Sequence, residues 1–349
     1  MTTDNPVEQQ PVSGGVAAEL EMEAARAPSG TSPWALAWRR LRRNKVSLAF
    51  GVLFVALVLS AFAAPLWAKH IAETTPDRNN VSGTVEKNGE TVDVVSLEGV
   101  PIGPQWQGKY FLGADSNGRD VMVRLLYGAR NSLFIGITAS FITIFLAVIL
   151  GVMAGYFRGW VDAVISRAFD VMWAFPVLLL GVALGVSLAT TGLNVWILEF
   201  RSGSLWIPTF IIGIVGVVYL ARPIRGQVLS LREKEFVEAA RAQGSGNLRI
   251  MFSELLPNVA STLLVFFPLI VANAILLEAA LSFLGAGVQP PNPSWGTMLS
   301  DGIDLLISCP HLTIVPGLML VLTVLSLNVF GDGVRDALDP RAKVRIEGA

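Results

Sequence analysis

Charge is scarce in this chain. Asp, Glu, Lys and Arg make up only 15% of its 349 residues, whereas a soluble domain usually carries about a quarter. Hydrophobic residues make up 52%, and the mean hydropathy is +0.56. The formal net charge of −1 provides no basic excess that would neutralise the phosphates of a nucleic acid. The composition therefore argues against a soluble enzyme and against a nucleic-acid binder.

Cysteine and histidine are almost absent. A single cysteine, Cys309, excludes an intrachain disulfide and a cysteine-cluster metal site. The two histidines, His70 and His311, cannot form a three-histidine site. His311 lies close to Cys309 in the sequence, but two ligands do not complete a coordination shell. We therefore expect no metal site and no cofactor in this chain.

Long apolar runs, in contrast, are abundant. A helix that crosses a bilayer needs about 20 mostly apolar residues, because the hydrocarbon core is roughly 30 Å thick. Six runs reach or approach this length, which makes a set of buried soluble helices a poor alternative. They are 46–68, 132–156, 171–198, 205–220, 259–284 and 312–330. The sequence predicts an all-α integral membrane protein with six transmembrane helices.

The distribution of basic residues predicts the orientation. Five basic residues at 39–45 directly precede the first run, and basic segments next to a span stay on the cytoplasmic side. Six crossings return the chain to that side, so both termini are expected in the cytoplasm. Residues 1–33 are acidic and contain much Pro, Ser and Gly, which predicts a disordered tail.

The segment between the first two runs is unusually long for a loop, so we expect it to fold or to carry a function. Residues 91–97 have the composition of a strand. Residues 119–130 carry apolar side chains at helical spacing. This spacing predicts either a helix on the membrane surface or an extension of the second span.

One motif in this loop imitates a nucleotide site. Residues 103–110, GPQWQGKY, nearly match the phosphate-binding loop G-x-x-x-x-G-K-[ST]. Tyr110 replaces the hydroxyl residue that would hold Mg²⁺, and no strand–turn–helix pattern surrounds the segment. Its expected position outside the cell is also remote from ATP. We therefore assign it no nucleotide.

The polar segment 221–258 follows the fourth run. Residues 229–243 have helical spacing, and Gly244 and Gly246 can supply the positive φ that ends a helix. Asn247 is placed to cap a second short helix. A helix–glycine–helix element that faces the cytosol is typical of a docking element, and an ordinary solvated loop is the alternative.

Several stretches, in order, resemble a known family. EAARAQG at 238–244 and LLP at 255–257 resemble the signature loop of bacterial ABC importer permeases, although Glu254 stands where that signature usually has Ile. Further stretches are similar to the C-type membrane subunit of dipeptide, oligopeptide and nickel importers. These are 111–133, 174–180, 277–302 and 317–341, so that the resemblance runs from about Trp38 to Arg341.

The resemblance implies a type I ABC importer permease fold in the bacterial cytoplasmic membrane, without catalytic residues of its own. The implied partners are a second, B-type permease, two ATPases that bind ATP and Mg²⁺, an extracytoplasmic solute-binding protein and membrane lipid. The implied divisions are the tail 1–33, the basic segment and first helix 34–68, the extracytoplasmic insert 69–128, the permease domain 129–331 with its coupling loop 221–258, and the cytoplasmic tail 332–349.

The resemblance also implies two contact sites. A coupling helix at about 235–243 would sit in a groove of one ATPase, through Glu235, Phe236, Glu238, Ala239, Ala240, Arg241 and Gly244. An outer hairpin with a short helix from about Ser294 would form a scoop that meets the binding protein, through Pro290, Pro291, Pro293, Trp295 and Gly296. Trp295 is equally placed to anchor the chain at the membrane interface.

Polar residues inside the fifth run are candidates for the translocation path. Glu278 is ionisable at membrane depth, which is a functional hypothesis by default. Asn273 is the second candidate. Hydrogen bonds between helices, or a position at the water boundary, are the alternatives. Gly151 and Gly155 form a small-residue pair that favours close approach of another helix.

The leading hypothesis is a permease that moves di- or oligopeptides and is driven by partner ATPases. Importers of nickel, glutathione or another small solute in the same family are the alternatives. From a different class, an ion-coupled secondary transporter would need inverted repeats with broken helices and coupling carboxylates at midplane. A membrane-embedded hydrolase would need a nucleophile and a base within the spans. The sequence shows neither pattern, Glu278 aside.

Overall fold

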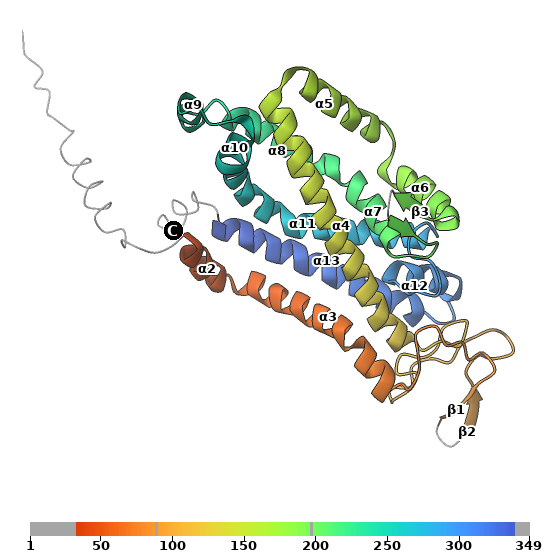
Figure 1. The fold of residues 1–349 in the computed structure, drawn as a ribbon. Helices are drawn as coiled ribbons and strands as arrows, with labels where there is room; N and C mark the ends of the chain where they lie inside the picture. The colour runs from red at the N-terminus through yellow and green to blue at the C-terminus, as the bar shows by residue number, and fades with distance from the viewer. Residues whose placement is uncertain (1–32, 88–89, 196–197, 339–349) are drawn as a thin grey trace, which may run out of the picture.

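A computed structural model describes residues 33–338, apart from 88, 89, 196 and 197. The tail expected at 1–33 lies outside the described residues except for its last position, and 339–349 of the tail expected at 332–349 also lie outside. The described part is mostly helical and adds two antiparallel hairpins (Figure 1). The predominantly helical class predicted from the sequence is thus confirmed.

Five helical segments are long and apolar enough to cross a membrane. They are α3 (Lys45–His70), α4 (Val121–Phe157), α7 with α8 (Trp206–Val215 and Val217–Leu231), α11 (Leu256–Phe283) and α13 (His311–Leu338). Each contains one of the predicted apolar runs, apart from a residue or so at its ends, and each extends beyond that run on at least one side. The first, second, fourth, fifth and sixth predicted spans are therefore confirmed.

The third predicted span, a single helix over 171–198, is wrong in its bounds. The chain instead forms α5 (Gly159–Ala174) and α6 (Val177–Thr191), which meet at an angle of 86°. Phe175 between them is extended (φ −96°, ψ 138°), because Pro176 disfavours the helical region for the residue before it. This bent pair is the candidate for a sixth crossing. A hairpin of β3 (Leu193–Val195) and β4 (Leu198–Phe200) follows it.

Helix α4 settles the two interpretations of residues 119–130. The side chain of Asp120 caps this helix by accepting a 3.0 Å hydrogen bond from the amide of Val123. From that cap the helix runs for 37 residues without a break. Such a helix rises about 55 Å, well beyond the roughly 30 Å of hydrocarbon. The extension of the second span is therefore confirmed, and a separate surface helix is not formed.

Close packing of α4 on α8 forms the largest core. A Cβ on Gly151 would lie 2.9 Å from the carbonyl oxygen of Ala221, and one on Gly155 would lie 2.8 Å from that of Arg225. The small-residue pair therefore permits the close approach that the sequence predicts. Helix α4 also contacts α3, α7 and α11, while α13 packs against α3 and α11 (Figure 1).

The segment between α3 and α4 is a small folded unit. Strands β1 (Thr84–Lys87) and β2 (Glu90–Asp93) pair in an antiparallel hairpin. The strand expected at 91–97 is thus shorter than predicted. The core of the unit is formed by Val94, Val95, Ile102, Tyr110 and Ala114. The length of this loop is therefore explained by its own hydrophobic core.

Short helices complete the fold. They are α2 (Pro33–Arg43), α9 (Glu235–Ala242), α10 (Asn247–Arg249), a π-helix (Ile250–Leu255), α12 (Trp295–Gly302) and a 3₁₀ turn (Ile303–Leu305). Helix α2 packs its residues Ala37 and Leu41 against the C-terminal turns of α13. Helix α9 and the C-terminal end of α13 lie at one end of the bundle, called the α9 end below, and α12 lies at the other, the α12 end (Figure 1).

Candidate functional site

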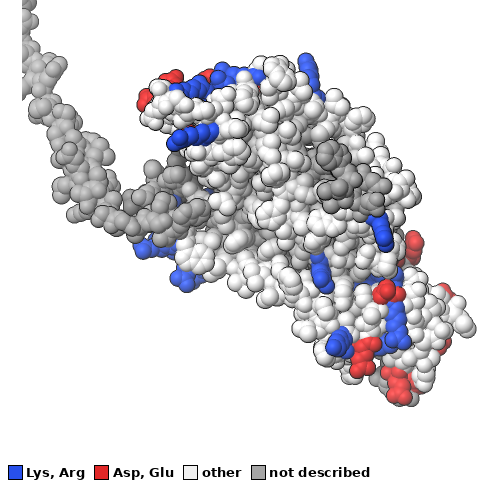
Figure 2. Space-filling view, in the orientation of Figure 1, with Lys and Arg blue, Asp and Glu red and all other residues white. Residues whose placement is uncertain are grey.

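Helix α9 stands out from the bundle on its own loop (Figure 1). The single helix predicted over 229–243 is interrupted, because α8 ends at Leu231 and α9 begins only at Glu235. Val237 and Ala240 point toward the protein and join the core formed by α4, α8 and α11. The opposite face of α9 is solvent-exposed, and charges of both signs gather there (Figure 2).

Six of the seven residues predicted for the coupling contact are exposed. They are Glu235, Phe236, Glu238, Ala239, Arg241 and Gly244. Ala240 is only 8% exposed and packs inward. The small side chain of Ala240 therefore lets α9 lie close to the bundle, and it is not part of the outer face.

One glycine ends α9. Gly244 has φ +80°, the left-handed conformation that glycine adopts without steric cost, whereas Gly246 has φ −69°. The stop signal predicted at Gly244 is confirmed, and the one at Gly246 is wrong. Asn247 is the first residue of α10 and makes no cap. The second short helix passes through the π-helix directly into α11.

Tyr156, near the end of α4, connects the spanning helices to this loop. Its hydroxyl donates a 2.8 Å hydrogen bond to Oδ1 of Asn247 at the start of α10. The guanidinium groups of Arg232 and Arg241 lie over its ring, 5.9 and 5.6 Å from the centroid. Nη1 of Arg232 also donates to the carbonyl oxygen of Tyr156. This role was not predictable from the sequence, because an aromatic residue at the end of an apolar run has the pattern of a simple membrane anchor.

Ion pairs reinforce the same end. Arg225 on α8 binds Asp162 on α5 through two hydrogen bonds, the longer of them 2.6 Å. Arg158 pairs with Glu233, just before α9. Together with the Tyr156 contacts, these bonds fix α9 to the ends of α4, α5 and α8. A displacement of α9 would therefore be transmitted to the helices that cross the membrane.

A cavity of about 440 Å³ lies between α4, α6, α7, α8 and α11. Its wall is mostly apolar, and the polar groups in it come from Thr143, Tyr219 and Asn273. The volume falls within the roughly 300–1,000 Å³ of small-molecule sites. Asn273, the second candidate for the translocation path, lies on the wall of this cavity.

Glu278 has a different environment. Its side chain is fully buried and is not among the residues that line this cavity. Its Oε1 accepts a 2.6 Å hydrogen bond from the hydroxyl of Ser282. Ser282 in turn accepts a 3.0 Å bond from the amide of Val288, in the segment that leads to α12. The bond to Ser282 lies within α11, whereas the alternative put forward from the sequence was a hydrogen bond between helices.

The outer hairpin is only partly exposed. Pro290 and Pro291 are open to solvent, while Pro293, Trp295 and Gly296 are buried. The ring of Trp295 is fully buried in the core shared by α4, α11 and α13, so its interpretation as an interfacial anchor is wrong. The predicted helix after Ser294 is α12, which begins with a capping box made by Ser294 and Thr297.

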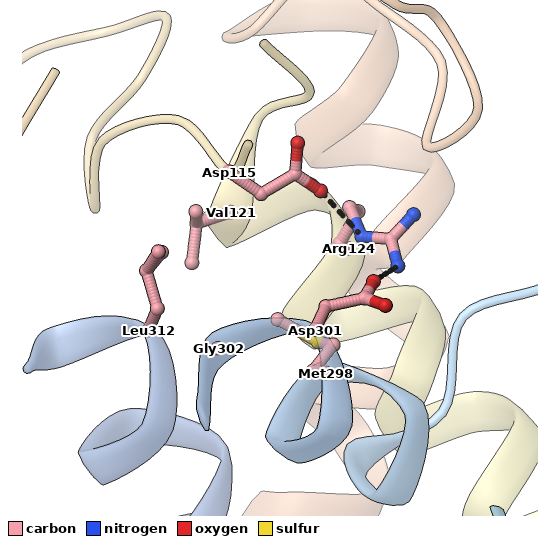
Figure 3. Close-up of a pocket in the computed structure, with 7 residues that line it drawn as sticks. All are labelled: Asp115, Val121, Arg124, Met298, Asp301, Gly302 and Leu312. Atoms are coloured by element: carbon pink, nitrogen blue, oxygen red, sulfur yellow. Dashed lines mark hydrogen bonds and ion pairs between the residues drawn. The ribbon is translucent and has the colours of Figure 1, made fainter. Parts of the chain in front are cut away.

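A ring of charges holds α12 in place (Figure 3). Arg124 of α4 is 3% exposed and binds Asp301 of α12 at 3.0 Å and Asp115 at 3.3 Å. Arg119 binds the same two carboxylates, at 3.1 and 2.7 Å. We call these four residues the charge clamp. The charge clamp joins the segment before α4, the start of α4 and the end of α12. No spacing in the sequence predicts it.

The segment 103–110, which imitates a phosphate-binding loop in sequence, contributes to the folding of the outer loop. The amide of Tyr110 donates a 2.6 Å hydrogen bond to Asp120, and its hydroxyl donates to the carbonyl oxygen of Gly118. Its side chain is buried in the core of the loop, and this burial raises the pKa of the phenol. No helix follows the segment, so the geometry of a phosphate loop is not formed here.

The remaining metal candidates are dispersed. Within 33–338, less the four undescribed positions, no group of three or more His, Cys, Asp or Glu side chains is arranged to hold an ion. Cys309 is buried, and its Sγ lies 3.7 Å from the carbonyl oxygen of Pro101. Cys309 therefore helps to join the outer loop to the start of α13.

Comparison with known families gives two matches. The profile described as "Binding-protein-dependent transport system inner membrane component" matches residues 147–344. The profile described as "N-terminal TM domain of oligopeptide transport permease C" matches residues 32–82. The first covers the spanning helices from the end of α4 onward, together with the α9 loop.

Curated relatives match almost end to end. The chain is 38% identical over 316 residues to the dipeptide transport system permease protein DppC of Alkalihalophilus pseudofirmus, covering 90% of this chain and 92% of that protein. It is 35% identical over 318 residues to the glutathione transport system permease protein GsiD of Pectobacterium atrosepticum, covering 91% and 94%. GsiD of Escherichia coli is also 35% identical, over 312 residues, covering 89% and 92%.

Among solved structures, two inward-facing crystal forms of the MetNI methionine ABC transporter are similar. Their TM-scores are 0.51 and 0.50, at 17% identity. The first covers 63% of this chain and 98% of the other, and the second covers 62% and 97%. This similarity concerns the fold.

Proposed function

The chain belongs to the family of binding-protein-dependent transport system inner membrane components, and we propose that it is the permease through which an ATP-driven importer moves di- and oligopeptides. Membership places it in the bacterial inner membrane, as a multi-pass component of a transport system. The relatives named for dipeptide and glutathione transport support a peptide substrate, because glutathione is itself a small peptide.

The observation that carries the proposal is the construction of α9. This helix presents six of the expected contact residues to solvent, and Arg158 and Tyr156 attach its loop to the end of α4. A rigid helix with an exposed face and a fixed base suits the transmission of a mechanical displacement. We propose that α9 lies in the cytosol, in the groove of an ATPase subunit, and that the N-terminus lies on the same side.

The partners follow from this arrangement. ATP and Mg²⁺ would bind to two ATPase subunits below the membrane, so that this chain would carry the work of hydrolysis without performing catalysis. A second, homologous permease would complete the pathway, with the cavity at Asn273 facing it. A solute-binding protein would dock at the α12 end, where Pro290 and Pro291 are exposed.

Glutathione import is the second candidate, because the 35% relatives carry that name over nine-tenths of this chain. An ion-coupled transporter has less support. Glu278 is occupied by hydrogen bonding to Ser282 and does not line the membrane cavity.

Reconstitution tests the proposal. The chain and its co-encoded subunits would be placed in liposomes that contain ATP, with the binding protein outside, and uptake of a radiolabelled dipeptide would be measured. We expect uptake that requires both ATP and the binding protein. Uptake of glutathione with no uptake of dipeptides would select the second candidate. Uptake that persists without ATP but collapses with an ion gradient would contradict both.

A further inference from the structure

A second cavity, of about 480 Å³, opens at the α12 end between the folded loop, the first turns of α4 and the outer hairpin. We call it the outer cavity. Four of its lining residues, Tyr127, Arg130, Asn131 and Phe134, follow one face of α4. Pro76 and Asp77 line it from the folded loop, and 291–293 line it from the hairpin.

The frame of the outer cavity is held in place by hydrogen bonds. Nδ2 of Asn131 donates a 2.7 Å bond to the carbonyl oxygen of Pro293. Nδ2 of Asn292 donates to the carbonyl oxygen of Gly203, just before α7. The hairpin is thus tied to α4 on one side and to the start of α7 on the other. The cavity is therefore preformed and is not a gap between loose loops.

Two charges of opposite sign face this cavity without a partner. Arg130 and Asp77 make no hydrogen bond or ion pair with any residue that the structure describes. The charge clamp nearby shows the contrast, since all four of its charged side chains are paired with one another. The hydroxyl of Tyr127 also has no hydrogen-bond partner among the described residues. The outer cavity therefore offers one anion-binding group, one cation-binding group and a free hydroxyl.

We infer that the outer cavity binds the two charged ends of a free peptide before it enters the membrane. This inference rests on the proposed function and names a site for its substrate. The guanidinium of Arg130 suits a carboxylate, which it can bind through two parallel hydrogen bonds. The carboxylate of Asp77 suits an ammonium group. Every unmodified peptide carries both groups, so such a site reads the backbone termini and tolerates any side chain.

The lining explains that tolerance. Phe134, Leu205 and Pro291 provide apolar surface for side chains between the two charges, and they contribute no charge that would select among them. The volume lies within the range of small-molecule sites and suits a di- or tripeptide. A zwitterionic lipid headgroup has the same pair of charges, so the test must separate the two sources.

The test measures binding to the assembled importer without its binding protein, in nanodiscs of phosphatidylglycerol, whose headgroup carries no ammonium group. The probes are L-alanyl-L-phenylalanine, its N-acetyl derivative and its C-terminal amide, and the binding of each is measured by saturation-transfer NMR. We expect Arg130→Gln to weaken binding of the free dipeptide about tenfold, because the charge-assisted hydrogen bonds to its carboxylate are lost, and to leave the amide unchanged, because the amide has no carboxylate. Asp77→Asn should weaken the free dipeptide and leave the N-acetyl form unchanged.

Arg78→Gln is the matched control, because Arg78 is exposed and adjacent to Asp77 but is not among the residues that line the cavity. Equal losses for all three probes would overturn the inference, since they would indicate a change of shape alone. A second result would also overturn it. If phosphatidylethanolamine nanodiscs abolished dipeptide binding to the unaltered protein but not to Arg130→Gln, the site would be assigned to a lipid headgroup.

Uptake by the reconstituted importer separates this inference from the proposed function. If dipeptides are transported but none of the probes depends on Asp77 or Arg130, the inference fails and the proposed function stands. If the unaltered importer transports no peptide at all, the proposed function fails as well.

Discussion

The carboxylate of Glu278 accepts a 2.6 Å hydrogen bond from the hydroxyl of Ser282, one turn further along α11, and both side chains are buried. Ser282 also accepts a bond from the amide of Val288. One hydroxyl thus joins the acidic residue of the spanning helix to the start of the outer hairpin. The bridge thus provides a partner for Oε1 of an ionisable side chain at a depth where an unpaired polar group is costly.

Removal of the hydroxyl should destabilise the chain. Ser282→Ala leaves the Glu278 carboxylate and the Val288 amide buried without this partner, which costs about 1–3 kcal/mol for each group. We expect a lower unfolding midpoint for the purified complex in detergent. The control is Ser261→Ala on the same helix, because Ser261 is exposed and bonds only its own turn. Equal midpoints for the two variants would contradict the role of the bridge.

The charge clamp should determine how firmly α12 is held. Arg124→Met removes one of the two arginines of the clamp, while Arg119 still pairs with Asp115 and Asp301, so we expect a loss of about 1.5–3 kcal/mol, the usual contribution of a hydrogen bond to a charged group. We expect faster amide hydrogen exchange over 295–302 in the purified complex. Arg167→Met is the comparison, because its pair with Asp170 is 85% and 55% exposed and 3.8 Å long. Unchanged exchange in Arg124→Met would show that α12 is held by apolar packing alone.

Two neighbouring glycines provide a test of α9. Gly244→Ala forces a side chain into a positive-φ conformation, at a cost of about 1–2 kcal/mol, and should displace the end of α9. Gly246→Ala should be tolerated, because its φ is −69° and no atom lies within 4 Å of the added Cβ. We expect Gly244→Ala, and more severely Glu238→Arg, to reduce uptake while substrate capture by the binding protein is unaffected. Wild-type uptake by both would refute the coupling role of α9.

The side of the membrane on which α9 lies can be measured directly. Ala239 is exposed on α9, and Ile307 is fully exposed beyond α12. The native Cys309 is buried, so only the cysteines introduced at these two positions should react with an added maleimide. We expect an impermeant maleimide to label Ile307→Cys in intact cells and Ala239→Cys only after lysis. Labelling of Ala239→Cys from outside would reverse the proposed orientation.

The spans were predictable from the sequence because hydrocarbon thickness imposes a length and a composition that few soluble segments share. The exception is instructive. Pro176 interrupts an apolar run that continues on both sides, and a hydropathy window does not distinguish one span from two short helices that meet at an angle. The break between α8 and α9 was missed for a related reason. Residues 232–234 are compatible with a helix in sequence, and only the tertiary arrangement of the chain ends α8 before them.

The exposed face of α9 was predictable, because helical spacing within a short polar segment determines which of its residues share a face. Contacts between distant segments were not. Arg124 and Asp301 are separated by 177 positions, and Tyr156 and Asn247 are separated by 91. Asp77 and Arg130 line one cavity only because the loop that carries Asp77 folds around its own core. Pairing over such separations depends on how the segments pack together, and the periodicity within one segment does not predict it.

The angle between α5 and α6 has a consequence for the surrounding lipid. Each arm rises about 22 to 24 Å, less than the roughly 30 Å of hydrocarbon, so neither reaches across alone. Lipid tails cannot hydrogen-bond the peptide groups left open where the two arms meet. If this bent pair is the sixth crossing, water or a neighbouring polypeptide must cover the elbow at Phe175 and Pro176, and the lipid seal around this subunit is interrupted there.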